Sequence, residues 1–386
     1  MLHAQTTPAQ VTPVRLGMST ALSGPASDLG INMKLGVEVA LQSQAVSGSH
    51  QYELVVLDDG YEPMRTIPNM RQLTGLENVQ AIIGNVGTPT SVVALPIVTS
   101  ENVCFYGAFT GAGVLRRQPP SDQVFNYRAS YAQETAAMVD GLIDYGHLKP
   151  QDIVLFTQRD AYGQAGYGGA IESMRRHGFS DTGRMLHVRY ERNSMNVETA
   201  LAQIILADRP PRAVIMVGAY GPCAKFIALA REHGVNALFL NVSFVGTQSL
   251  INALGDQSEG VIITQVVPHP QSDLPVVQAY RQAMSRYAPD AGLSFGSLEG
   301  YIATVLFQHA MQRVPAPLTR QKIIDGLADL GTVDIGLGHP LTLNATRHQA
   351  SNMVWPTMVR DGQAMPFDWK QLAPMLGNDD QGERHE

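Results

Sequence analysis

A chain of 386 residues is longer than one typical hydrophobic core needs, so two domains of ordinary size are expected. Hydrophobic residues make up 44% of the chain and charged residues 16%, which is typical of a soluble globular protein. The net charge of −7, without any run of Lys or Arg, argues against nucleic acid or an anionic membrane surface as a partner. No apolar stretch reaches the roughly 20 residues that span a bilayer.

The N-terminal segment indicates export. Residues 1–13 are polar and rich in Pro and Thr, and we expect them to be disordered, like the charged tail 375–386. The sequence LHAQ at residues 2–5 resembles the small-residue end of a secretory signal whose charged and apolar regions are missing. We therefore expect an exported protein whose signal peptide is absent from this sequence.

The first part of the chain alternates short apolar segments with amphipathic ones. We predict strands at 15–22, 52–59, 79–85 and 102–109, and helices at 31–46, 64–76 and 89–101. Strands that alternate with helices of this length are typical of βαβ units and a parallel sheet.

The pattern starts again after VFNYRASY, residues 124–131, which we interpret as a join between two units. Further strands are predicted at 152–158, 185–190, 212–220, 237–244 and 259–267, and further helices at 163–177, 197–208, 222–234 and 247–255. Three more helices are predicted at 275–287, 297–314 and 319–330, followed by short strands at 339–343 and 352–359.

These elements predict an α/β protein with two doubly wound parallel-sheet lobes joined by three crossovers. We expect the crossings near 125–128, 265–268 and 332–338. The predicted domains are an N-terminal lobe of 14–126 plus 267–331 and a C-terminal lobe of 127–266 plus 332–374.

Sequence signatures of enzymes are missing. There is no GxSxG, HExxH or GxxxxGK[ST] motif, and Arg116 stands where a dinucleotide turn beginning at Gly111 needs its third glycine. Cys104 and Cys223 lie far apart, which favours two inert buried thiols. We expect no catalysis, metal or cofactor, with an enzyme on a flavodoxin-like fold as a remaining alternative because a fold alone does not exclude chemistry.

Small polar and aromatic residues collect where predicted strands end, and in open α/β sheets ligands bind beyond those ends. Thr88 suits an N-cap and Pro89 a first helical position, which leaves backbone N–H groups for a carboxylate; an ordinary capped helix is the alternative. Tyr162 and Tyr220 each stand between a strand and a helix, and a Tyr offers an apolar face with one hydrogen-bonding tip. Two further strands end in Phe109-Thr110 and Ser243-Phe244.

The order of these motifs resembles a known family. In chain order they are SGPASDLG, DD at a strand end, IIGNVGTP, YGAFT, DAYGQAG, VGAY, SFVGTQSL and EGYIA. The series is similar to the type I periplasmic binding proteins, the solute receptors of ABC importers of the leucine/isoleucine/valine-binding kind, over residues 14–360. The resemblance implies a periplasmic protein that closes two lobes on a small-molecule ligand by a hinge motion and is then read by a membrane ABC permease.

The resemblance also implies which residues bind the ligand. They are Thr88 and Pro89 for a carboxylate, Phe109 and Thr110 in a second carboxylate loop, the cleft tyrosines Tyr162 and Tyr220, and Leu29, Phe295 and Leu298 around the ligand side chain.

One position departs from the family pattern. Where amino-acid receptors of the family carry an acid that pairs with the ligand ammonium, this sequence has Ser243. A buried ammonium without a charged partner is costly, so the sequence favours an aromatic or aliphatic carboxylate that lacks an α-amino group. An amino-acid receptor with another counter-charge, Glu299 or Asp160, stays an alternative, and so does a ligand-sensing domain that feeds a receptor or kinase.

Overall fold

The computed structural model describes residues 13–43, 46, 50–181, 183 and 185–377. The proposed signal remnant at residues 2–5 and most of the two predicted tails lie outside the described residues. Helix α12 (Leu372–Met375) ends at the first residue of the predicted C-terminal tail. None of the helices in the described ranges combines the length and apolar character needed to cross a membrane.

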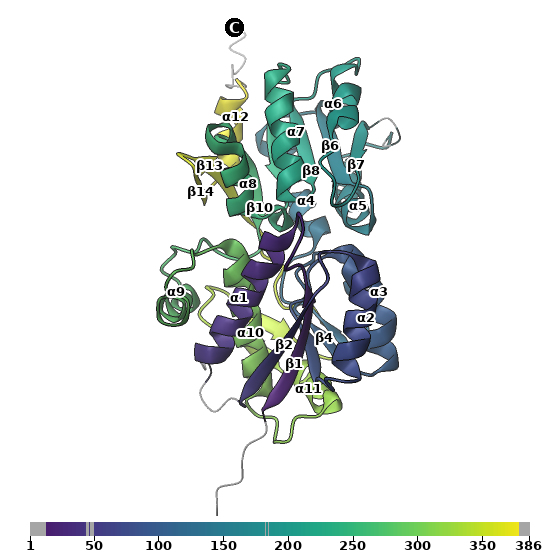
Figure 1. Ribbon diagram of the computed structural model, residues 1–386. Helices are drawn as coiled ribbons and strands as arrows, with labels where there is room; N and C mark the ends of the chain where they lie inside the picture. Colours follow the sequence, from purple (N-terminus) through teal and green to yellow (C-terminus); the bar gives the residue numbers. More distant parts are fainter. Residues whose placement is uncertain (1–12, 44–45, 47–49, 182, 184, 378–386) are drawn as a thin grey trace, which may run out of the picture.

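The first lobe is built on a parallel five-stranded sheet with the order β2-β1-β3-β4-β5, in the lower half of Figure 1. Its elements are β1 (Val14–Thr20), α1 (Ser27–Ser43), β2 (Tyr52–Asp58), α2 (Pro63–Thr74), β3 (Ala81–Ile83), α3 (Thr88–Ser100), β4 (Cys104–Tyr106), η1 (Gly113–Leu115) and β5 (Val124–Phe125). Strands β3 and β4 are shorter than predicted, because Gly84 and Gly107 follow them with φ angles of 69° and 59° that end the extended backbone.

The second lobe is built on a seven-stranded sheet with the order β14-β13-β10-β9-β8-β6-β7. Its elements are α4 (Tyr131–Asp140), η2 (Gly141–Tyr145), η3 (Pro150–Asp152), β6 (Ile153–Gln158), α5 (Ala161–Arg176), β7 (His187–Tyr190), α6 (Glu198–Ile205), β8 (Ala213–Val217), α7 (Tyr220–Glu232), β9 (Leu238–Asn241), η5 (Ser243–Val245), α8 (Thr247–Leu254), η6 (Gly255–Ser258), β10 (Ile262–Gln265), β13 (Trp355–Arg360), β14 (Gln363–Pro366) and η7 (Trp369–Gln371). Strands β6 to β10 are parallel, and β13 and β14 add an antiparallel edge. The predicted fold of two doubly wound lobes is therefore confirmed.

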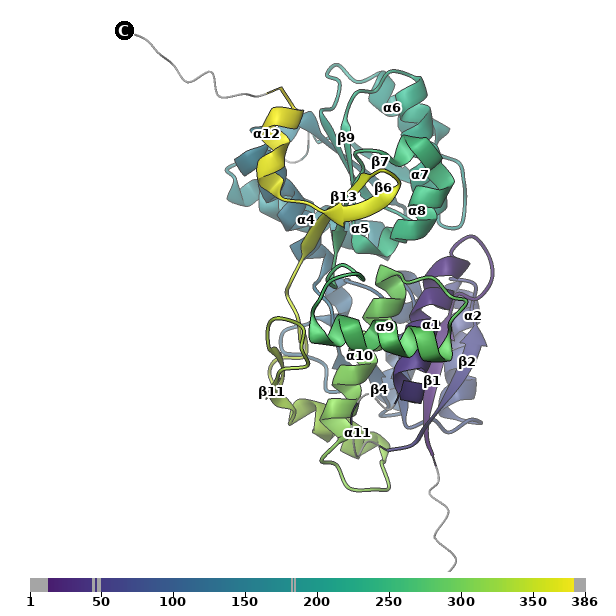
Figure 2. The same ribbon diagram turned by 90° about the vertical axis from the view of Figure 1, so that its left-hand side faces the viewer.

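Three helices, α9 (Pro275–Tyr287), α10 (Phe295–Met311) and α11 (Arg320–Ala328), return to the first lobe, where α10 packs along α1 (Figures 1 and 2). A Cβ atom at Gly36 would lie 1.9 Å from the carbonyl oxygen of Ser297, and one at Gly300 would lie 2.5 Å from that of Met33. The two helices approach this closely only because both positions are glycine. This contact fixes the start of α10 at the edge of the cleft.

The three segments that connect the lobes are tied together by hydrogen bonds. The carbonyl oxygens of Asn126 and Tyr127, after β5, accept from the backbone N–H groups of Ala350 and Ser351 at 2.9 and 2.8 Å. The hydroxyl of Tyr127 donates to the carbonyl oxygen of Val266, after β10, at 3.3 Å. These hydrogen bonds tie the three crossings into one connection. The third crossing, which leads to β13, is the yellow-green segment in Figure 2.

This third crossing lies later than the sequence predicts. Strands β11 (Gly331–Val333) and β12 (Leu341–Leu343) pair with each other, and the N–H of Val276 in α9 donates to the carbonyl oxygen of Gly336 at 3.2 Å. Residues 332–338 therefore lie beside the first lobe, and the crossing predicted there is wrong. The remaining domain limits stay a prediction, with 332–350 proposed for the N-terminal lobe.

Candidate ligand-binding site

An open cavity of about 380 Å³ lies between the lobes, at the carboxyl ends of the strands. Four of the residues predicted to bind the ligand line it: Leu29 in the first turn of α1, Phe109 in the loop after β4, Ser243 from the second lobe, and Phe295 at the start of α10. Leu298, in the next turn of α10, is fully buried in the core and does not line the cavity. The cavity wall thus combines apolar side chains with a few polar groups, as small-molecule sites do.

Ser243 is fixed to a buried carboxylate. Its backbone N–H donates to Glu134 Oε2 at 2.8 Å, and its hydroxyl donates to Glu134 Oε1 at 3.0 Å. The Thr264 hydroxyl, on β10, donates to Glu134 Oε2 at 2.8 Å. Glu134 is fully buried in the first turn of α4. The cavity wall therefore presents the hydroxyl of Ser243, and the carboxylate beside it, Glu134, already has its hydrogen-bond partners.

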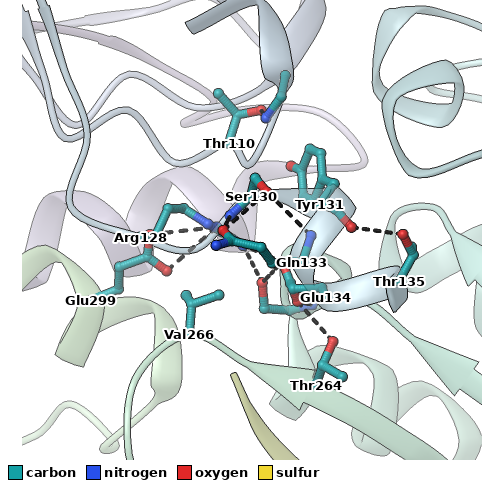
Figure 3. Close-up of polar contacts among 12 residues, drawn as sticks. Thr110, Arg128, Ser130, Tyr131, Gln133, Glu134, Thr135, Thr264, Val266 and Glu299 are labelled. Atoms are coloured by element: carbon teal, nitrogen blue, oxygen red, sulfur yellow. Dashed lines mark hydrogen bonds and ion pairs between the residues drawn. The ribbon is translucent and has the colours of Figure 1, made fainter. Parts of the chain in front are cut away.

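The guanidinium of Arg128 lies behind this wall and joins both lobes (Figure 3). Arg128 Nη2 donates to Glu134 Oε1 at 2.9 Å and contacts the Ser243 hydroxyl, whereas Arg128 Nη1 reaches Glu299 on α10 at 3.4 and 3.5 Å. The same guanidinium lies over the rings of Phe109 and Tyr131, 5.3 and 5.6 Å from their centroids. Its Nε is buried without a hydrogen-bond partner in the described residues. We call Arg128, Glu134 and Glu299 the ion cluster.

Burial and charge set the protonation of the ion cluster. Burial raises the pKa of Glu299 to about 7, although the positive charge of Arg128 opposes this shift. Burial also acts to lower the pKa of Arg128, but the charges of Glu299 and Glu134 outweigh it, so that pKa is raised. Arg128 is therefore charged, whereas the carboxyl of Glu299 holds its proton to a higher pH than an exposed Glu does.

The predicted carboxylate loops meet each other inside the first lobe. The hydroxyls of Thr88 and Thr110 are 2.7 Å apart and buried, and neither residue lines the cavity. Helix α3 begins at Thr88, with Gly87 as its N-cap, so Thr88 is not the cap that the sequence predicts. Pro89 is buried in the first helical turn. The ligand-binding role of these residues remains a prediction.

The two predicted cleft tyrosines differ in exposure. Tyr162 is fully buried, and its hydroxyl donates to the carbonyl oxygen of Gly218 at 3.2 Å. Tyr220 is half-buried at the start of α7, and a Cβ atom at Gly246 would lie 3.3 Å from its ring and 2.8 Å from Leu29 Cδ2. Tyr220 therefore borders the cavity wall, whereas Tyr162 lies behind it.

The alternative counter-charge Asp160 has another task. Its carboxylate caps α5, accepting from the backbone N–H groups of Tyr162 at 2.9 Å and Gly163 at 3.4 Å. Burial raises its pKa. An acid that the sequence analysis did not single out, Asp28, lines the cavity and accepts a hydrogen bond from Ser249 of the second lobe at 2.7 Å.

Contacts at the opposite rim also cross between the lobes. Glu62, before α2, accepts from Arg192 at 2.8 Å and from the Asn193 side chain at 2.6 Å. Gln158 of the second lobe donates to the hydroxyl of Tyr61 at 3.1 Å. With contacts at both rims, the two lobes are closed on each other in this structure.

Sequence reasoning missed Arg128, Glu134 and Tyr61. A charged residue inside the predicted join VFNYRASY was a usable signal for Arg128, because a crossing segment faces both lobes. Nothing local distinguishes Glu134 from an ordinary helical acid. The cysteines behave as predicted: both are free and buried, and burial raises the pKa of each thiol. No group of three or more His, Cys, Asp or Glu side chains within the described ranges is placed to hold a metal.

Comparison with known proteins identifies the family. A family model described as periplasmic binding protein matches residues 13–364. The crystal structure of a possible leucine/isoleucine/valine-binding protein from Rhodopirellula baltica SH 1 is 46% identical, with a TM-score of 0.91 over 95% of this chain and 99% of that one. A substrate-binding periplasmic protein from Ralstonia solanacearum is 25% identical, with a TM-score of 0.82 over 92% of this chain and 100% of that one.

A curated relative, the Leu/Ile/Val-binding protein homolog 3 of Brucella melitensis biotype 1, is 26% identical over 161 residues, which are 40% of this chain and 42% of that protein. The family match, in contrast, spans both lobes and the crossings. The chain therefore belongs to the periplasmic binding protein family, as a type I member related to the leucine/isoleucine/valine-binding proteins.

Proposed function

We propose that this protein is the periplasmic solute-binding component of an ABC importer and closes on a small organic carboxylate that lacks an α-amino group. Family membership supports binding without catalysis, and the closed cleft with its cavity of about 380 Å³ supports a small ligand. The membrane permease is its proposed partner. The charges next to the cavity support the choice of ligand class.

The observation that carries the proposal is the state of Glu134. Its two oxygens accept four hydrogen bonds, from Arg128, from Thr264, and from the N–H and hydroxyl of Ser243. An ammonium ion at Ser243 would therefore compete with bonds that are already made. The nearest positive charge, Arg128, has a buried Nε without a partner in the described part of the chain. The acid beside Ser243 thus has its charge already paired with Arg128 and is not free to pair with an ammonium ion.

Glu299 is a weak substitute for the missing acid. Its bonds to Arg128 are long, at 3.4 and 3.5 Å, and burial raises its pKa to about 7. A carboxyl whose pKa is raised in this way gives an ammonium ion a weaker counter-charge than an exposed carboxylate does.

A second candidate is an amino-acid receptor that uses Asp28. This acid lines the cavity, and the 46% identical structure is of a possible leucine/isoleucine/valine-binding protein. Asp28 is partly exposed and already accepts from Ser249, so water and that hydroxyl both weaken its hold on an ammonium ion. We therefore rank this candidate second.

Three ligands that share one carbon skeleton decide between the candidates. 4-Methylpentanoate is leucine without its ammonium, and 3-methylbutylamine is leucine without its carboxylate. Calorimetry should show 4-methylpentanoate binding at least tenfold more tightly than leucine, and the amine should not bind, because a buried unpaired ammonium costs several kcal/mol. Benzoate extends the test to aromatic acids.

Two variants provide the matched controls. Ser243→Glu should weaken carboxylate binding by adding a negative charge beside Glu134, whereas Asp28→Asn should change it little. Leucine binding more tightly than 4-methylpentanoate, and losing affinity in Asp28→Asn, would establish the amino-acid receptor instead. Native mass spectrometry of the purified protein identifies a ligand that stays bound.

A further inference from the structure

Phe244 fills the inner part of the cleft between the lobes. Its side chain is fully buried on η5 of the second lobe. Four rings surround it, two from each lobe, and we call the five residues the ring cluster. The ring centroids lie 4.7 Å from Tyr162, 5.5 Å from Phe109, 5.9 Å from Tyr61 and 6.4 Å from Tyr131.

The backbone around Phe244 fixes the direction of its side chain. The preceding N–H, of Ser243, is bound to Glu134, and the following N–H, of Val245, donates to the carbonyl oxygen of Val242 at 2.9 Å. Gly246 then turns the chain with a φ of 80°, where a side chain would strike Leu29. With both flanking residues held, the ring has no free route out of the cleft while the lobes are closed.

The cavity does not reach this ring. Ser243 and Phe109 line the cavity, but Phe244 itself and Tyr162 do not. The hydroxyl pair Thr88–Thr110 is absent from the lining as well. Residues that the family resemblance assigns to the ligand are thus separated from the open space. Phe244 lies among them, and Phe109, which packs on Phe244, lies between Phe244 and the cavity.

We propose that Phe244 determines specificity by closing the inner cleft, so that the ligand occupies only the outer cavity between Leu29, Ser243 and Phe295. The substrate class is then limited to short carboxylates, because a longer apolar tail would need the volume that the ring holds. This deepens the proposed function and rests on it for the carboxylate. Removing the ring joins the inner space to the outer cavity.

Phe244→Ala tests the proposal against a matched control. Phe226→Ala removes the same side chain from an equally buried place in the second lobe, where Phe226 stacks on Phe156 at 4.2 Å, away from the cleft. Straight-chain carboxylates from butanoate to decanoate are titrated calorimetrically into the unmodified protein and both variants. In Phe244→Ala the chain length that binds best should increase by at least two carbons, with decanoate gaining tenfold or more in affinity. Phe226→Ala should keep the original optimum.

The same optimum in all three proteins would overturn the proposal. If no carboxylate binds any of the three proteins, the proposed function fails. Straight-chain α-amino acids from norvaline to 2-aminodecanoate then test the role of Phe244, which predicts the same increase in the chain length that binds best. A crystal structure of Phe244→Ala gives an answer independent of any ligand: a void continuous with the outer cavity is expected, and a sealed void or a collapse of Tyr162 into the space contradicts it. Phe244→Leu, which should show a smaller shift, replaces the alanine variant if that one does not fold.

Discussion

The ion cluster and the ring cluster both connect the two lobes, and they touch each other at Phe109 and Tyr131. The ion cluster connects the lobes by charge pairing, whereas the ring cluster connects them by aromatic packing. In the ion cluster, Arg128 keeps a short bond to Glu134 in the second lobe and a long one to Glu299 in the first. The ring cluster packs Phe244 against aromatic rings of both lobes without needing a fixed angle. In our proposals, the ion cluster accordingly accounts for the ligand charge and the ring cluster for the ligand size.

The largest effect on stability is expected when Arg128, the central residue of the ion cluster, is replaced. Arg128→Leu leaves Glu134 and Glu299 buried without their cation, so we expect the free energy of unfolding to fall by about 3–5 kcal/mol. Urea denaturation measures this loss. Arg117→Leu, at the exposed neighbour of Arg116, should change stability by less than about 0.5 kcal/mol. A loss below about 1 kcal/mol in Arg128→Leu would show that the rings alone hold the lobes.

The next effect concerns Glu299 and pH. Its pKa is raised from 4.5 to about 7, so between these values the folded state holds a proton that the unfolded state has released, and the free energy of unfolding falls as pH rises. The charged groups that act on Glu299 are Arg128, Glu134 and Arg116. Glu299→Gln removes this dependence, so the stability difference between variant and unmodified protein should change by roughly 2–3 kcal/mol from pH 4 to pH 8.

Urea denaturation at several pH values provides that measurement. Glu38→Gln, which changes a carboxyl to an amide in a surface pair with Lys34, is the control and should run parallel to the unmodified protein. Parallel curves for Glu299→Gln as well would mean that folding leaves the pKa of Glu299 unshifted, so that Glu299 is ionised at neutral pH, which would favour the amino-acid receptor.

A smaller effect separates the two cleft tyrosines. Tyr220→Ala removes a ring at the cavity border, and we expect it to weaken 4-methylpentanoate binding by about 1–2 kcal/mol. Tyr162→Phe keeps its place in the ring cluster and loses only the hydroxyl bond to Gly218, so it should cost about 1 kcal/mol of stability and leave affinity unchanged. Calorimetry and denaturation together distinguish the two tyrosines. Affinity that falls in Tyr162→Phe and is unchanged in Tyr220→Ala would place the ligand in the inner cleft instead.

The smallest effect is expected at the rim. The Arg192–Glu62 pair crosses between the lobes, but the side chains are 24% and 40% exposed, so solvent screens it and Arg192→Ala should lower affinity by at most about 1 kcal/mol. Arg159→Ala breaks an exposed pair with Glu191 inside the second lobe and should not alter affinity. A larger loss in Arg192→Ala would place the control of closure at the rim instead of the two clusters.

The sequence predicts most of the architecture because apolar periodicity is local. Helix α9 begins and ends at the residues predicted, 275 and 287, and the parallel strands β1 to β4 and β6 to β10 each lie within or overlap a predicted strand, whereas β5 and β14 were not predicted. Strand ends are recognisable for the same reason, which is why Phe109 and Ser243 could be expected at a site, whereas Leu29 and Phe295 followed from the family resemblance; all four line the cavity. The position predicted for the third crossing was wrong because β11 and β12 pair with each other. The sequence of a short apolar segment does not show which strand it will pair with.

By itself, the sequence determined two doubly wound lobes, a cleft at their strand ends and a serine where the family resemblance implies an acid. Only the tertiary structure decided what surrounds that serine. Glu134 and Arg128 are six residues apart, but Arg128 and Glu299 are 171 apart and meet only in the folded protein. Phe244 likewise faces the cleft because of the turn at Gly246 and the position of the opposite lobe. Side-chain direction and charge pairing across a cleft depend on how two separately folded sheets are set against each other, and no local pattern contains that information.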